Sequence, residues 1–234
     1  MPDQQVVASR RAPRTRRGRT PTHTIRDITG AAVAIADRDG LAGVTMREVG
    51  RSIGTGAASL YRYVSTRDEL VALMVDQVNG ELVLTAERPG PWQEKMLELA
   101  HNAREIYRRH PWMLEALDSA PPLGPNGCAY LEHTLDLLSP TGSGGRTKLE
   151  AIGVFSGLVR LLAKAERNEQ QAASSIVEAR TQQLHAAAAD GNHPRLAEAL
   201  AEATFGRTTG VDAVGDQDQF GRILRRVLTG LLTG

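Results

Sequence analysis

Apolar residues recur at intervals of three and four along nearly the whole chain, the spacing that places them on one face of an α-helix. No stretch alternates apolar and polar positions between hairpin turns, so we expect no β-strand. The 234 residues, 41% of them apolar, are enough to build a globular core. The pattern predicts an all-α fold, with helices at about 24–38, two short ones within 45–64, and then 67–87, 91–109, 112–119, 126–138, 146–170, 172–189, 194–205 and 216–234.

Two short apolar stripes stand close together between Thr45 and Leu70, where the sequence reads TMREVGRSIGTGAASLYRYVSTRDEL. The first stripe stops at Gly54, which is typical of a helix C-terminus, and the second begins three residues later. A helix, a tight turn and a steeply angled second helix form the helix-turn-helix, which places its second helix in the major groove of DNA. The two stripes are Met46, Val49 and Ile53, then Ala57, Leu60, Tyr61 and Val64.

Capping boxes mark two helix starts in this segment. Thr45 is followed three residues later by Glu48, and Thr66 by Glu69. In such a box the threonine accepts a hydrogen bond from an unpaired amide of the first turn, while the glutamate bonds back to the amide at the cap. The sequence therefore predicts helices that begin after Thr45 and after Thr66.

This segment resembles the DNA-binding domain of TetR-type (tetracycline-repressor-like) transcriptional regulators. Their signature ends in Leu-Tyr-x-His/Tyr-Phe/Val, followed by a helix that opens with Lys/Arg-Asp/Glu-Glu-Leu. The resemblance covers about residues 22–75 and departs from the pattern at Thr55, usually valine, and Gly56, usually a capping serine. The matching positions are Leu60, Tyr61, Tyr63, Val64, Arg67, Glu69 and Leu70.

The resemblance implies a basic flexible arm at 1–21, a three-helix DNA-binding head at 22–66, and a larger helical domain for effector binding and dimerisation at 67–234. It implies phosphate contacts for Tyr61 and Arg67, and Arg62 could read a guanine edge from the outer face of the second helix. The alternatives are a core position for Tyr61, a solvated charge for Arg62 and a purely capping role for Thr45. The expected DNA-binding residues are Thr45, Arg47, Ser59, Tyr61, Arg62, Tyr63 and Arg67.

Positive charge is concentrated at the start of the chain. Residues 1–26 hold seven arginines and one aspartate, a net charge of +6, which leaves −5 for the remaining residues of a chain whose total is +1. A cationic arm next to a helix-turn-helix favours a contact with DNA, where such arms can enter the minor groove. The alternative is a solvated tail.

Other chemistries have little support in the sequence. Gly54-x-Gly56 resembles part of a dinucleotide-binding fingerprint, but that motif needs a preceding strand and a third glycine, and position 59 is serine. The six histidines and the single Cys128 do not stand at metal-ligand spacing, and no nucleophile elbow is present. We therefore expect no enzyme activity, no cofactor and no metal, with a nucleotide-dependent enzyme as a remote alternative. Without a signal-peptide core or an apolar run long enough to cross a bilayer, the chain is expected in the bacterial cytoplasm, bound to the nucleoid when on DNA.

The second half of the chain predicts a dimer interface and an effector pocket. A wide apolar face on the last helix needs a cover, and Gly153 and Gly157 on the long 146–170 helix are typical of close helix approach. We expect the helices near 146–170 and 216–234 to pair with those of a second copy, although packing within one subunit is the alternative.

Regulators of this type hold a small apolar or amphipathic effector in the larger domain, and release from a palindromic operator follows from effector binding. A DNA-binding dimer with a solid core is the rival hypothesis, and ordinary core packing is the alternative for each wall residue. Met96, Tyr107, Met113 and Leu117 are further wall candidates. The predicted ligand-binding residues are Leu99, Asn102, Ile106, Trp112, Tyr130, His133 and Phe155.

Overall fold

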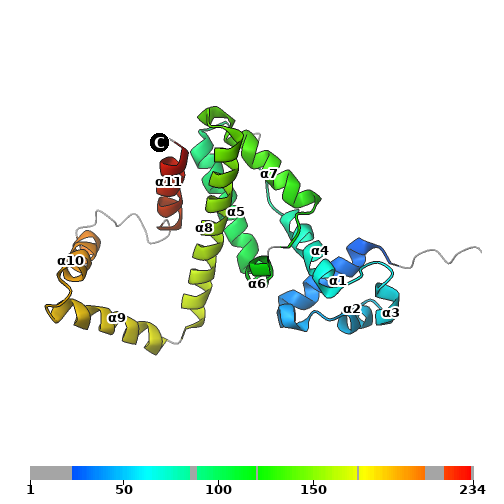
Figure 1. The fold of residues 1–234 in the computed structure, drawn as a ribbon. Helices are drawn as coiled ribbons and strands as arrows, with labels where there is room; N and C mark the ends of the chain where they lie inside the picture. Colours follow the sequence, from blue (N-terminus) through cyan, green and yellow to red (C-terminus); the bar gives the residue numbers. More distant parts are fainter. Residues whose placement is uncertain (1–22, 85–88, 120, 173, 209–218, 233–234) are drawn as a thin grey trace, which may run out of the picture.

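The computed structural model describes residues 23–84, 89–119, 121–172, 174–208 and 219–232, and all regular elements in these ranges are helical (Figure 1). This confirms the predicted all-α fold, while the arm at 1–21 lies outside the described residues. The α-helices are α1 (Ile25–Asp39), α2 (Met46–Ser52), α3 (Ala57–Leu60), α4 (Arg67–Asn79), α5 (Trp92–Arg109), α6 (Met113–Ala116), α7 (Pro125–Leu137), α8 (Gly145–Gln171), α9 (Ser174–Ala189), α10 (Pro194–Thr208) and α11 (Gln219–Leu232); short 3-10 turns are η1 (Leu41–Gly43), η2 (Leu117–Ser119) and η3 (Ser139–Thr141).

Helices α1 to α3 form a small head that packs on α4 (Figure 1). A capping box that the sequence analysis missed starts α1, because the Thr24 hydroxyl accepts from the Asp27 amide at 3.1 Å and the Thr24 amide donates to Asp27 at 2.8 Å. The helix ends at Gly40, whose φ of 74° is in the region that favours glycine. The head core continues beyond α4 into Ile106, at the end of α5, so head and body share one apolar cluster.

The two predicted capping boxes are half correct. The hydroxyls of Thr45 and Thr66 accept from the amides of Glu48 and Glu69 at 3.2 and 3.0 Å. Neither glutamate bonds back to its threonine: Glu48 pairs with Arg51, and Glu69 accepts from the Ser65 amide at 2.7 Å. The starts of α2 and α4 are thus as predicted, with a different use of the carboxylates.

Helix α4 is shorter than predicted, since it ends at Asn79 and not near Glu87. Its last turn is held by α7, where Asn126 Nδ2 donates to the Asp76 carbonyl at 2.9 Å. The Gly127 amide donates to the Asp76 carboxylate at 3.0 Å. Gly124 must stay glycine for this approach, because a Cβ there would lie 2.3 Å from Asp76 Cγ. The end of α4 therefore depends on a segment far away in the sequence.

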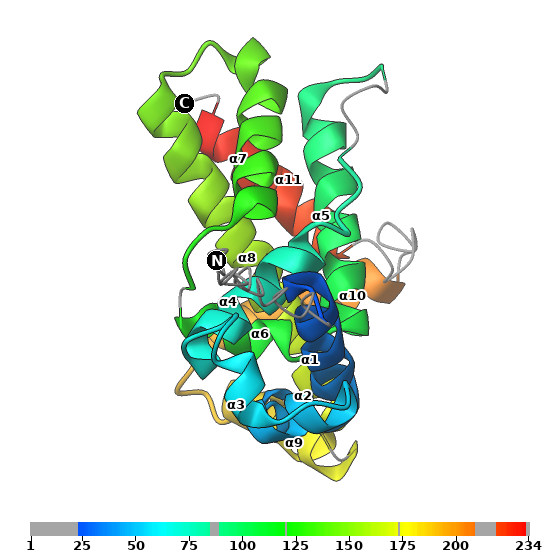
Figure 2. The same cartoon turned by 90° about the vertical axis from the view of Figure 1, so that its right-hand side faces the viewer.

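The body consists of α5, α7, α8 and α11 around a second apolar cluster, and in Figure 2 these helices stand above the head. Phe220, Leu224 and Leu228 of α11 are buried against this cluster. Toward the C-terminal part of α8, Glu166 accepts from Arg104 of α5 at 2.7 Å and also from Arg108 of the same helix. Burial alone would raise the pKa of Glu166, but the two arginines hold this pKa below its ordinary value. The carboxylate therefore stays charged in both ion pairs.

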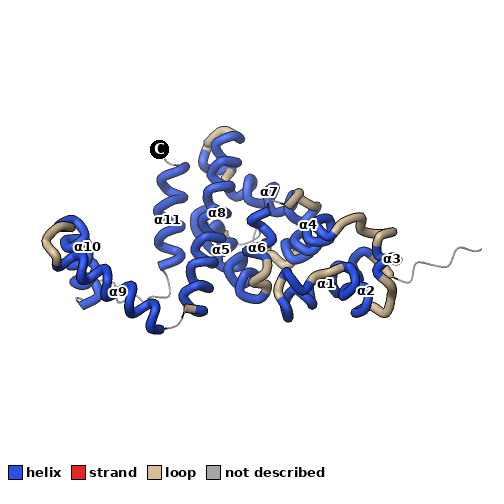
Figure 3. Tube along the Cα trace, turned by 60° about the horizontal axis from the view of Figure 1, so that its bottom comes forward, coloured by secondary structure: helices blue, strands red, loops and turns tan. Residues whose placement is uncertain are grey.

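Helices α9 and α10 pack on each other and lie apart from the α5–α8 body (Figures 1 and 3). Alongside, the outer face of α8 leaves apolar side chains in solvent: Val154 and Leu161 are 49% and 62% exposed. Within the described residues, no helix is long and apolar enough to span a membrane.

Candidate DNA-binding head and effector pocket

The turn between α2 and α3 is fixed by two glycines. Gly54 has a φ of 71°, a conformation that side chains other than glycine rarely adopt. Gly50 is buried in α2, and a Cβ there would lie 2.9 Å from the Thr55 carbonyl oxygen. The Gly50 carbonyl also accepts from the Thr55 amide at 2.8 Å. The close contact that sets the angle between the two helices thus needs a glycine at position 50, which the sequence analysis did not single out.

Helix α3 spans only four residues, shorter than the apolar stripe predicted, and it begins at Gly56 without a side-chain cap. Leu60 and Val64 fill the head core, while Tyr61 is 55% exposed, so the structure does not place Tyr61 in the core. Arg62 is exposed, and Ser59 and Tyr63 are half-buried. The outer surface of this turn therefore presents the hydroxyl of Tyr61 and the guanidinium of Arg62 to solvent.

Arg67 is exposed at the start of α4 and has two intramolecular partners that the sequence analysis did not predict, while its phosphate contact stays a prediction. Its Nε donates to the Val44 carbonyl at 2.9 Å and its Nη2 donates to the Leu41 carbonyl at 2.7 Å. These bonds tie the start of α4 to the turn before α2, so Arg67 also has a structural role at the surface of the head. Arg47 and Thr45 are exposed on the first turn of α2, and the Thr45 hydroxyl caps that helix.

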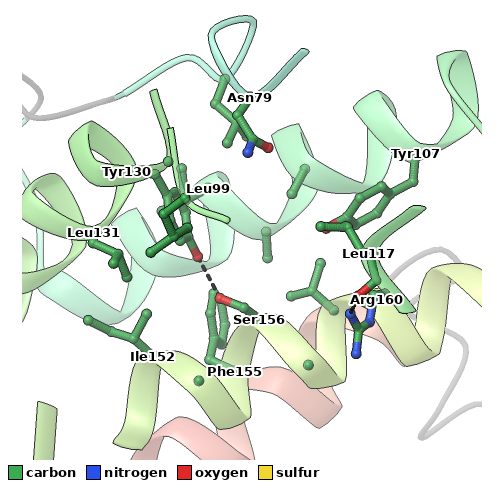
Figure 4. Close-up of a pocket in the computed structure, with 18 of the residues that line it drawn as sticks. Asn79, Leu99, Tyr107, Leu117, Tyr130, Leu131, Ile152, Phe155, Ser156 and Arg160 are labelled. Carbon is green, nitrogen blue, oxygen red and sulfur yellow. Dashed lines mark hydrogen bonds between the residues drawn. The ribbon is translucent and has the colours of Figure 1, made fainter. Parts of the chain in front are cut away.

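A pocket of about 370 Å³ lies among α5, α7 and α8 (Figure 4). Three of the predicted ligand-binding residues, Leu99, Tyr130 and Phe155, line it, as do two of the four further candidates, Tyr107 and Leu117. The other two, Met96 and Met113, are buried in the body and head clusters instead. The Tyr130 hydroxyl and the Ser156 hydroxyl form a hydrogen bond of 2.8 Å across the lining. Burial raises the pKa of Tyr130, so its hydroxyl stays neutral.

The other four predicted residues do not line this pocket. Asn102 donates to the Val83 carbonyl at 3.4 Å, and Ile106 packs in the head-side cluster. Trp112 is buried in that same cluster. His133 is buried on α7 with its Nε2 unpaired among the described residues, and burial lowers its pKa. A helical stripe identifies inward positions, but it does not say which of two clusters each residue joins.

Three polar wall residues were missed by the sequence analysis: Asn79 at the end of α4, Ser156 and Arg160. Ser156 and Arg160 both lie on α8 and line the pocket, one helical turn apart. Their spacing from Ile152, four residues before Ser156, puts all three on one face. That periodicity was the available signal, but a polar residue beside an apolar stripe is more often solvated.

A polar junction joins the head to the body. Asp37 on α1 accepts from Trp112 Nε1 at 2.7 Å and lies 2.7 Å from His110 Nδ1. The other ring nitrogen of His110 is 3.3 Å from Glu81, which also pairs with Arg109 at 2.8 Å. His110 and Trp112 are 8% and 3% exposed, so the head carboxylate is held by nearly buried groups next to α6.

Comparison with known proteins identifies the family. The sequence model of "Bacterial regulatory proteins, tetR family" matches residues 28–74, and that of "Tetracyclin repressor-like, C-terminal domain" matches residues 85–234. The chain belongs to the TetR family of DNA-binding transcriptional regulators. Members of the TetR family are regulators and not enzymes, so the Gly54-x-Gly56 motif is the turn of a helix-turn-helix and the nucleotide-dependent enzyme is excluded.

Several relatives cover most of the chain. The "HTH-type transcriptional repressor DrrR1" of Streptomyces coeruleorubidus is 36% identical over 93% of this chain and 80% of its own length. An "HTH-type transcriptional regulator" of Saccharopolyspora erythraea is 31% identical over 76% of this chain and 75% of its own. The crystal structure of the TetR family protein ActR of Streptomyces coelicolor, in complex with actinorhodin, has a TM-score of 0.73 at 28% identity, covering 91% of this chain and 97% of that one.

Proposed function

We propose that this TetR family member is a homodimeric repressor that binds a palindromic operator and is released from it by a small apolar or amphipathic effector. The main observation behind the proposal is that one chain holds both exposed side chains directly after α3, those of Tyr61 and Arg62, and a 370 Å³ pocket. Each alone fits other functions. Together they supply a DNA-reading surface and a place for a ligand to control it.

The segment after α3 presents two kinds of group that can contact DNA. The exposed hydroxyl of Tyr61 suits a backbone phosphate, which fixes register without reading sequence. The exposed guanidinium of Arg62 can donate two hydrogen bonds to a guanine edge in the major groove. Ser59, Tyr63 and the first turn of α2, with Arg47 and Thr45, complete the proposed surface, and the basic arm at 1–21 adds phosphate contacts.

The pocket favours an effector-controlled regulator over its rival, a dimer with a solid body. Its volume is within the range of roughly 300–1,000 Å³ that is typical of small-molecule sites. ActR, whose fold covers most of this chain, has been solved in complex with actinorhodin. An effector acts only through different affinities for two arrangements of the heads, so its binding must favour a spacing that does not fit the operator.

The dimer is supported by apolar surface that one chain leaves uncovered. On α11, Leu224 and Leu228 are buried, but Ile223 and Val227 are half-buried and Leu231 is 37% exposed. The outer face of α8 is exposed as well. A second copy that packs on both helices buries these side chains and places two heads on one operator, about 34–36 Å apart for half-sites one helical turn apart.

The experiment is genome-wide mapping of bound sites in the source bacterium, with transcription of the neighbouring genes measured with and without the regulator. We expect an inverted repeat at the bound sites and higher transcription of the adjacent genes when the regulator is absent. Unchanged or lower transcription would contradict a repressor. A DNA-binding regulator acts at the chromosome, and we therefore place it in the bacterial cytoplasm.

A further inference from the structure

The effector pocket has an uneven distribution of charge. Arg160 is the single charged residue among those that line it, and no carboxylate lies in the described wall. Most of the remaining wall is aliphatic or aromatic carbon. Asp118, which follows Leu117 in η2, interacts with Arg160, but it is paired with Lys164 at 2.9 Å and does not line the pocket. In such a low-polarity wall a charged guanidinium attracts oxyanions and repels ammonium groups more strongly than it would in water.

Arg160 lies at one end of the pocket with Tyr107 and Leu117, while Tyr130, Leu131 and Ile152 lie toward the other end (Figure 4). The Arg160 Nη1 donates to the Leu117 carbonyl at 3.0 Å. This bond fixes the half-buried guanidinium and leaves its other N–H groups for a further acceptor. A fixed guanidinium loses little entropy when it binds a second partner.

The Tyr107 hydroxyl adds a second donor at this end. No described residue hydrogen-bonds to it, although the side chain is largely enclosed. Burial raises the pKa of Tyr107 to about 12, with Tyr130 adding to the increase and Arg160 opposing it. The hydroxyl is therefore a neutral donor at any physiological pH, and it lacks an acceptor.

From this geometry we propose that Arg160 and Tyr107 select an effector that carries an oxyanion, a carboxylate or an acidic phenolate, on a flat apolar skeleton. The inference rests on the proposed effector role of this pocket and goes further by fixing the charge of the ligand. Small residues in the lining leave space for fused rings: a Cβ added at Gly153 or Gly157 of α8 would meet no atom within 4 Å, and Ala100 and Ala103 of α5 also line the pocket.

The test uses three probes of the same ring system with the full-length protein: anthraquinone-2-carboxylate, its methyl ester and 2-(aminomethyl)anthraquinone. Isothermal titration calorimetry at pH 7.5 measures the three dissociation constants. We expect the acid to bind at least about 10-fold more tightly than the ester, and the amine to bind more weakly than the ester, because charge-assisted hydrogen bonds are the strong ones.

Three variants assign the preference to its residues. Arg160→Gln should weaken binding of the acid by about 10- to 100-fold and change the ester by less than about 3-fold. Tyr107→Phe should weaken the acid by about 3- to 10-fold, and Arg160→Lys should restore part of the preference. The matched control is Arg146→Gln, which removes a positive charge from the same helix at an exposed position paired with Glu150, and it should leave all three affinities unchanged.

Ester and acid of equal affinity would overturn the inference, as would an Arg160→Gln variant that loses both probes equally, since that result means a purely structural role. Failure of the acid to bind a protein that still binds its operator also overturns it. If the unmodified protein binds no operator DNA, the result contradicts the proposed function and not the ligand preference.

Discussion

The bond between Trp112 and Asp37 offers a quantitative test of how the head is held on the body. Trp112→Phe keeps an aromatic ring in the shared cluster and removes the one N–H that donates to Asp37. The donor is nearly buried, whereas the Asp37 side chain is 33% exposed and keeps its contact with His110. Water can thus partly replace the lost donor at the carboxylate.

The expected magnitude follows from these contacts. A hydrogen bond to a charged group contributes about 1.5–3 kcal/mol, and the exposure of Asp37 argues for the lower end. The smaller ring adds about 0.5 kcal/mol of lost apolar burial. A total loss of about 2 kcal/mol in the free energy of unfolding lowers the Tm by roughly 4–8 °C for a chain of this length.

The assay is thermal and urea unfolding followed by circular dichroism, in a double-mutant cycle with Asp37→Ala. Trp92→Phe is the matched control, because Trp92 is a half-buried tryptophan whose indole has no hydrogen bond to a described residue. It should lower the Tm by no more than about 2–4 °C. The cycle should give a coupling energy of about 1–2 kcal/mol between positions 37 and 112.

Additive effects of Trp112→Phe and Asp37→Ala, within about 0.5 kcal/mol, would refute the reasoning, because residues that do not interact behave in that way. Equal losses in Trp112→Phe and in the Trp92→Phe control would refute it too, since ring size alone would then explain the result.

Four further predictions test other parts of the structure. Gly50→Ala should lower the free energy of unfolding by about 1–3 kcal/mol, because the added Cβ meets a backbone carbonyl oxygen at 2.9 Å. The control Gly30→Ala, whose Cβ in α1 meets no atom closer than 3.7 Å, should be neutral or stabilising, and equal effects in calorimetric melts would contradict this. Arg67→Ala should lower the Tm by a few degrees through the loss of two carbonyl contacts, and an unchanged melt would exclude that role. Arg62→Ala should cost about 1–3 kcal/mol of operator affinity at one base pair of each half-site, as fluorescence anisotropy with single-base variants can measure; an equal loss on random DNA would argue against base reading. Because burial lowers the pKa of His133, this side chain takes up a proton in the unfolded chain at a higher pH than in the folded one, so stability should fall as the pH drops below 6.5. His133→Leu should reduce this fall in melts between pH 7.5 and 5.5. Parallel curves for variant and parent would contradict the role of His133.

The helical organisation could be predicted from sequence because it depends on local periodicity and caps. The long α8, predicted at 146–170, spans Gly145–Gln171, and the starts of α2 and α4 follow their capping threonines. The end of α4 was missed because Leu82 and Val83 continue its apolar pattern, although Gly80, its C-cap, was a local signal for a helix end. Contacts from α7, some fifty residues later, hold the last turn of the helix in addition.

The candidate sites show the same division between local and long-range information. Leu99, Tyr130 and Phe155 face the pocket, but Trp112 and Ile106, which share their apolar character, face the head instead. Arg160 has no local signal that separates it from a solvated arginine. Its position in the lining depends on a long-range contact, the bond from its Nη1 to the Leu117 carbonyl in η2.

The central claim is that two copies of this head read one two-fold symmetric operator. The direct measurement selects duplexes from a random pool with the purified protein and then determines the stoichiometry on the selected duplex by analytical ultracentrifugation. Two chains per duplex, on an inverted repeat whose half-site centres are about 10 base pairs apart or a multiple of that, are the predicted result. One chain per duplex on a selected sequence without inverted symmetry would contradict the account.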